Sequence, residues 1–160
     1  MILFIPPQYK TKAEKLGYLG EALVSHHFGG DMSDDKYDTE KDIRLLVGQN
    51  VQVKTQNRNK YRNVFSVDSM SKSAFENCMT IDRLIFVEYD ASDNITIWEC
   101  TDRENHIFYT TSKGKVMIGW PIDKMTPLKV IYDKELSHQM RSHSQSRDFS
   151  LDSPYAFNQF

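Results

Sequence analysis

Hydrophobic residues between Thr11 and Phe28 recur at the three- and four-residue spacing of a helix, and they form one apolar stripe made of Leu16, Leu19 and Leu23. Thr11 is followed three residues later by Glu14, which is the arrangement of a capping box. The pattern predicts a helix over residues 11–28 that ends at two glycines. Gly17 and Gly20 inside it each cost about 1 kcal/mol relative to alanine, so we expect a strand or a ligand backbone to approach this helix closely.

Alternating hydrophobic and polar residues predict short strands along most of the remaining chain. The predicted strands cover residues 43–47, 51–55, 63–68, 83–89, 94–100, 106–112, 115–120 and 127–132. Residues 71–81 have helical spacing, with Ser69 or Ser71 as the cap, whereas the acidic residues 31–40 predict a surface loop. The order of helix, three strands, helix and further strands predicts a mixed α+β or α/β fold, in which helices flank a central mixed sheet.

The 160 residues suit one domain, which we place over residues 1–133. Residues 134–160 are polar and predict an extension, either a helix followed by a tail or a mobile tail throughout. The net charge of −2 creates no global field for nucleic acid, so an anion-binding surface must come from local clusters. The hydrophobic runs are too short for a membrane span, and the two cysteines match no metal or redox spacing, so we expect a cytoplasmic protein.

Residues 41–54 predict a hairpin whose three-residue loop ends at Gly48. In this register Asp42 lies opposite Gln52. The hairpin then has an apolar face, with Ile43, Leu45, Val51 and Val53, and a polar face, with Asp42, Arg44, Gln52 and Lys54. A turn shifted to Gly48–Gln49 would instead put Asp42 and Gln52 on opposite faces.

Directly opposed side chains have Cβ atoms about 5 Å apart, so Asp42 and Gln52 could hold one metal ion between them. Mg²⁺ accepts a carboxylate, an amide oxygen and a backbone carbonyl such as that of Val53. Lys54 could steer or deprotonate a water and neutralise charge on a phosphate. The alternative is a solvated strand face with an ion pair from Asp42 to Lys54 or Arg44.

Three segments resemble motifs of the PD-(D/E)XK nuclease superfamily, most closely of its archaeal Holliday-junction resolvase branch. They are "GYLGEALVSHHF", "KDIRL" and "VQVKT", within residues 15–68. Gly17 and Glu21 match the helix signature, Asp42 matches the aspartate strand, and Lys54 matches the last motif. Gln52 stands where the family usually has an acid, which should weaken metal binding unless Glu21 compensates.

The resemblance implies a restriction-endonuclease-like core and a Mg²⁺-dependent DNA endonuclease, in which Mn²⁺ can substitute. It implies catalytic roles for Glu21, Asp42, Gln52 and Lys54, with the metal held by Asp42, Gln52, the Val53 carbonyl and Glu21. A solvated glutamate remains the alternative for Glu21. Residues 54–62 carry several cations and no acid, so we expect phosphate contacts there or, alternatively, a basic loop without a ligand. The expected DNA contacts are Lys15, Gly17, Arg44, Thr55, Arg58, Lys60 and Arg62.

The resemblance also implies a homodimer that makes two symmetric incisions during DNA recombination or repair. Apolar strands such as residues 116–120 are a candidate interface. Three alternatives remain open: a restriction-type or genome-degrading nuclease on duplex DNA, a catalytically inactive DNA-binding module of the same fold, and a plain α+β interaction domain.

Overall fold

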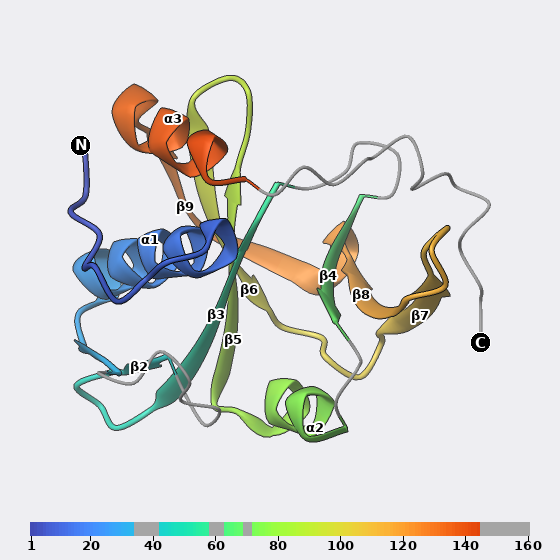
Figure 1. The fold of residues 1–160 in the computed structure, drawn as a ribbon. Coiled ribbons are helices and arrows are strands. Elements are labelled where there is room, and N and C mark those ends of the chain that lie inside the picture. The colour runs from blue at the N-terminus through green and yellow to red at the C-terminus, as the bar shows by residue number, and fades with distance from the viewer. Residues whose placement is uncertain (34–41, 58–62, 69–71, 145–160) are drawn as a thin grey trace.

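The computed structural model describes residues 1–33, 42–57, 63–68 and 72–144, which form a mixed α+β fold with two sheets (Figure 1). The central sheet is mixed, because one neighbouring pair of strands in its middle is parallel and the other pairs are antiparallel. Its strand order is β1 (Asp31–Met32), β2 (Ile43–Arg44), β3 (Asn50–Gln56), β5 (Arg83–Tyr89), β6 (Asn94–Cys100) and β9 (Met125–Tyr132). The parallel pair is β3 with β5.

The second sheet is antiparallel and has the order β4 (Val64–Asp68), β8 (Val116–Pro121) and β7 (Ile107–Thr110), with a short 3-10 helix, η1 (Ile122–Lys124), after β8. The predicted hairpin around Lys113–Gly114 joins β7 to β8 and is confirmed. Thr111 N donates to Lys115 O at 2.8 Å, and Gly114 has a φ of +82°, which favours glycine.

Helices flank the central sheet on both faces, as the sequence predicts (Figure 1). α1 (Lys12–Phe28) and α3 (Lys134–Ser142) cover one face, whereas α2 (Lys72–Thr80) and the second sheet lie against the other. α3 is the first part of the polar extension, so the helical alternative is confirmed there. It buries Leu136 and Met140 completely in the core beneath α1.

α1 has the predicted capping box between Thr11 and Glu14, and it packs on β3 with Gly20 at a point of close approach. A Cβ built on Gly20 would lie 1.7 Å from Oγ1 of Thr55, so only glycine allows this approach. A Cβ on Gly17 would meet no atom within 4 Å. One of the two glycines therefore marks the close approach of a strand, and the other faces open space.

Four predictions about local structure either need correction or concern residues that the structure does not describe. The strand expected over 43–47 is shorter, because Leu45 to Gly48 form the turn after β2. Asp31 and Met32 are a strand and not part of a loop; the rest of that loop and the two candidate caps of α2 lie outside the described residues. Residues 117–120 are buried in the second sheet, so this strand is not the predicted dimer interface.

Candidate functional site

The hairpin between β2 and β3 has the register that the sequence predicts. Ile43 lies opposite Val51, and the loop closes through Leu45 N donating to Gln49 O and Gly48 N donating to Leu45 O, both at 2.9 Å. Gly48 has a φ of +88°, the left-handed conformation expected at the end of a three-residue loop. The shifted turn is thereby excluded.

β2 and β3 separate soon after the hairpin loop, and Asp42 lies where they separate. Within the described residues, Asn50 and Val51 are the two residues of β3 that pair with β2. Beyond that point the Asp42 carboxylate takes the place of a strand, because its Oδ2 accepts a hydrogen bond of 2.7 Å from the backbone N of Val53. Since the N–H and C=O of one strand residue point to the same edge, the Val53 carbonyl faces the same side as Asp42.

Glu21 reaches this edge from α1, directly after the glycine that touches β3. Its carboxyl group hydrogen bonds with the carboxylate of Asp42. Burial and the negative charge of Asp42 together raise the pKa of Glu21 to about 8, although the ammonium of Lys54 acts in the opposite direction. At neutral pH the two carboxyl groups therefore share a proton, and the three residues form one electrostatic cluster.

Gln52 and Lys54 alternate with the buried Val51 and Val53, so they lie on the face of the sheet toward α2. Gln52 is only 9% exposed, and its Oε1 accepts a hydrogen bond of 3.1 Å from Nδ2 of Asn77 in α2. This bond fixes the amide so that its oxygen has one lone pair left for another partner.

The thiol of Cys78, the next residue of α2, lies close enough to Lys54 for the two charges to interact. Burial raises the pKa of this thiol, and the positive charge of Lys54 opposes the increase. α2 therefore lines the site beside both polar residues of β3. Asn77 could not be predicted from the sequence, because one asparagine in a helical pattern carries no signal of its partner.

Arg103 holds α2 in place and was also missed. Its guanidinium caps the C-terminal end of the helix by donating to four backbone oxygens: Cys78 at 3.2 Å, Met79 at 3.3 Å, Asp82 at 2.8 Å and Ile81. Carbonyls at a helix end lack partners within the helix, so this contact stabilises the last turn. It also fixes the height of Asn77 over the sheet.

The predicted DNA contacts that fall within the described residues lie on α1, β2 and β3. Lys15 and Gly17 lie in the first half of α1, and Arg44 is exposed on β2. The Thr55 hydroxyl is buried beneath Gly20 without a hydrogen-bond partner among the described residues, so its placement does not favour a DNA contact. Arg58, Lys60 and Arg62 lie outside the described residues.

The donor set at the edge fits a hard divalent cation. It contains two carboxylates, one amide oxygen and one strand carbonyl, from Glu21, Asp42, Gln52 and Val53, which are the ligand types that Mg²⁺ accepts. In the described part of the chain no group of three or more His, Cys, Asp or Glu side chains is placed to hold a metal. A cation here would therefore depend on the amide and the carbonyl beside the two acids.

No protein-family model matches the sequence, and no curated protein is significantly similar to it. The resemblance to the PD-(D/E)XK superfamily therefore depends on the motif residues and on the geometry described above. None of the helices in the described ranges has both the length and the apolar character needed to cross a membrane.

Proposed function

We propose that this protein is a Mg²⁺-dependent DNA endonuclease of the PD-(D/E)XK type that cuts branched DNA. The observation that carries the proposal is the convergence of Glu21, Asp42 and Lys54 where β2 and β3 separate, with Gln52 two residues before Lys54 on β3. These residues come from a helix and two strands, and the shifted pKa of Glu21 is typical of a functional site.

The chemistry follows from the positions of these groups. A divalent cation held by Asp42, Gln52, the Val53 carbonyl and Glu21 would supply Lewis acidity and lower the pKa of a bound water. The ammonium of Lys54 orients the attacking water and neutralises charge that develops on the phosphate oxygens. Glu21 would give up its proton to hold such a cation, because a bound cation would stabilise both carboxylates as anions.

The order of elements also supports the proposal. α1 is followed by the two-residue strand β1, by β2, β3 and β4, and then by α2 and β5, so apart from β1 the order is the helix, three strands, helix and strand expected of the family. β4 differs, because it pairs in the second sheet. We further propose a homodimer, since cutting a four-way junction needs two symmetric incisions.

A second candidate is a catalytically inactive DNA-binding module with the same fold. Three contacts favour it: Asp42 bonds to Val53, Gln52 bonds to Asn77, and Glu21 bonds to Asp42. Each of these three side chains thus has a protein partner, and the amide of Gln52 contributes no charge to metal binding. Such a site is stable without a cation.

A nicking assay separates these functions. The protein is incubated with Mg²⁺ and a four-way junction, a flap or a linear duplex of equal length. We expect cleavage of the junction, with a loss of at least about a hundredfold in Asp42→Asn and Lys54→Ala. Asp123→Asn, an exposed aspartate of η1, is the matched control and should keep full activity.

Each other outcome selects an alternative. Equal cleavage of the duplex indicates a restriction-type or genome-degrading nuclease. Binding without cleavage at any divalent cation indicates the inactive module. Absence of DNA binding even at low salt indicates an interaction domain, because phosphate contacts are strongest there.

A further inference from the structure

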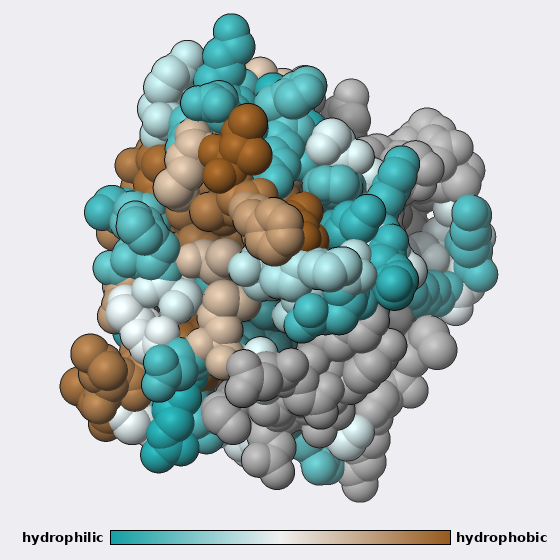
Figure 2. Space-filling view, turned by 60° about the vertical axis from the view of Figure 1, so that its left-hand side comes forward, coloured by the Kyte–Doolittle hydropathy of each residue, from teal (hydrophilic) through white to brown (hydrophobic). Residues whose placement is uncertain are grey.

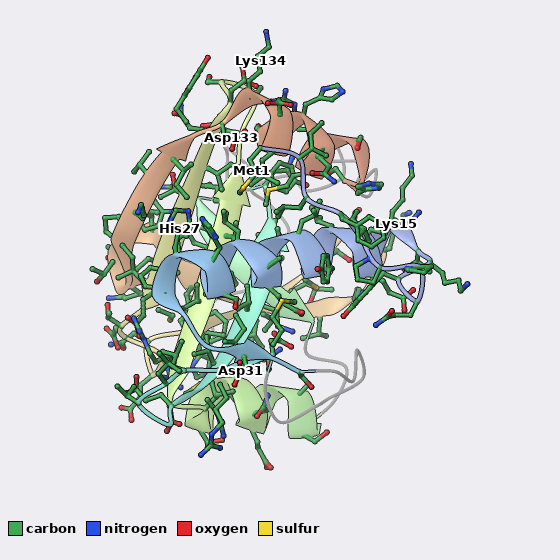
Figure 3. The ribbon with its side chains drawn as sticks, turned by 90° about the vertical axis from the view of Figure 1, so that its left-hand side faces the viewer. Met1, Lys15, His27, Asp31, Asp133 and Lys134 are labelled. Atoms are coloured by element: carbon green, nitrogen blue, oxygen red, sulfur yellow. The ribbon has the colours of Figure 1, made fainter. Side chains whose placement is uncertain are left out.

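A pocket of 430 Å³ lies away from the candidate metal site, between the N-terminal segment, the start of α1 and the end of α3. Figure 3 shows Lys15 at the N-terminal end of α1 and Met1 beside α3, and Lys15 is one of the residues that line the pocket. Pockets that hold small ligands have about 300–1,000 Å³, so the volume suits a ligand of nucleotide size. None of its lining residues belongs to the metal site.

The walls of the pocket are held by contacts between distant parts of the chain. The amide of Gln139 in α3 pairs with the backbone of Leu3 in both directions, at 3.0 and 2.7 Å. The amino group of Met1 lies 2.6 Å from Oδ1 of Asp133, which also caps α3. The pocket is therefore fixed before a ligand arrives, which reduces the entropy that binding costs.

The pocket has an apolar wall of Ile5, Pro6 and Pro7. The segment that carries this wall also exposes Ile2 and Phe4, which are 69% and 79% exposed. Figure 2 shows hydrophobic side chains gathered on this side of the molecule and bordered by hydrophilic ones. A ligand seated here can thus place a flat apolar group on one side of its charge.

The charged lining is cationic. Lys10, Lys15 and His143 line the pocket, and among the residues that the structure describes no acid lines it. Burial lowers the pKa of His143, and the positive charges of Lys15 and Lys12 lower it further. Glu14, beside Lys15 in the chain, accepts hydrogen bonds from the backbone N of Lys10 at 3.1 Å and of Thr11 at 3.0 Å. A bound anion would relieve the repulsion among these positive charges.

We propose that this pocket binds the phosphate of a nucleotide. Lys10 and Lys15 contact the phosphate, and the sugar and base lie against Ile5, Pro6 and Pro7. Lysine provides a compact charge for a phosphate. The nucleotide is either free or the phosphorylated end of a DNA strand. The site shares no residue with the metal site, so it stands or falls independently of catalysis.

Calorimetry with deoxythymidine 5′-monophosphate, in the absence of divalent cations, tests the proposal. We expect tighter binding than for inorganic phosphate, and a loss of about tenfold in Lys15→Gln and in Lys10→Gln. Lys134→Gln is the matched control, because Lys134 is exposed at the other end of α3 (Figure 3), and it should bind as the parent does. Failure of the parent to bind, or equal binding by Lys15→Gln, overturns the proposal.

Two further arms complete the test. If inorganic phosphate binds as tightly as deoxythymidine 5′-monophosphate, the apolar wall has no role in binding. Competition by a 5′-phosphorylated oligonucleotide, but not by its 5′-hydroxyl twin, supports a strand end as the ligand; competition by the mononucleotide alone supports a free nucleotide. In the parent, saturation should raise the pKa of His143 measured by NMR, because a nearby anion favours the charged imidazole. An unchanged value contradicts binding at this pocket.

Discussion

Replacing Gly20 with alanine would put a methyl group into the contact between α1 and β3. The new Cβ would lie 1.7 Å from Oγ1 and 3.0 Å from Cβ of Thr55. Non-bonded heavy atoms rest about 3.5–4.0 Å apart, so the hydroxyl, the helix or both must move. Overpacking of this severity costs about 3 kcal/mol, and the better helix propensity of alanine returns about 1 kcal/mol. We expect a net loss of about 2 kcal/mol.

Gly17→Ala is the matched control, because it makes the same change one turn earlier in the same helix. Its Cβ would meet no atom within 4 Å, so only the propensity acts and stability should rise by about 1 kcal/mol. Thermal unfolding resolves the two, since 1 kcal/mol shifts Tm by about 3 °C in a chain of this size. The pair of variants should therefore move Tm in opposite directions.

Thr55→Ala in the Gly20→Ala background identifies the contact responsible. Removing the hydroxyl and methyl groups leaves only Cβ near the new side chain, so we expect about half of the lost stability to return. Because Glu21 follows Gly20 directly, the displaced helix should also weaken divalent-cation binding. A Gly20→Ala protein as stable as the parent would show that the contact between Gly20 and Thr55 does not require glycine.

Three further predictions concern the site and its support. The pKa of Glu21 is raised from 4.5 to about 8, so the folded chain holds a proton that the unfolded chain loses, and metal-free stability should fall as pH rises through this range; urea unfolding of Glu21→Gln should lack this fall. Asn77→Ala should weaken Mn²⁺ affinity about tenfold, measured by calorimetry, because the amide of Gln52 can then turn. Arg103→Met should lose about 3 kcal/mol in thermal unfolding, because backbone oxygens at the end of α2 lose their donor; an unchanged Tm would contradict the capping role.

The hairpin and the first helix were predictable because their determinants are local. Gly48 can adopt a positive φ, and the alternation on each side of it then fixes which residues face α1. The capping box of α1 likewise needs only Thr11 and Glu14. These two elements are also the ones that bring Asp42 and Glu21 together, so the acidic part of the candidate site could be predicted.

The rest depends on contacts between residues far apart in sequence. Nothing near Arg103 indicates that it caps a helix more than twenty residues earlier. The composition after residue 133 is polar, and Leu136 and Met140 are two apolar residues within it. Two apolar positions are too few to indicate that this helix buries one face. From the sequence, the apolar strand at residues 116–120 could equally pack against a partner or in the core of its own chain. In the structure it pairs with β4 and residues 117–120 are buried.

Binding of a divalent cation by Asp42 and Glu21 is tested by calorimetric titration of Mg²⁺ or Mn²⁺ at neutral pH, in two buffers with different ionisation enthalpies. Because the pKa of Glu21 is about 8, the account predicts that each bound cation releases nearly one proton, and that Asp42→Asn abolishes binding. Glu21→Gln should bind more weakly and release no proton. Absence of cation binding in the parent, or binding that Asp42→Asn leaves unchanged, would contradict the account.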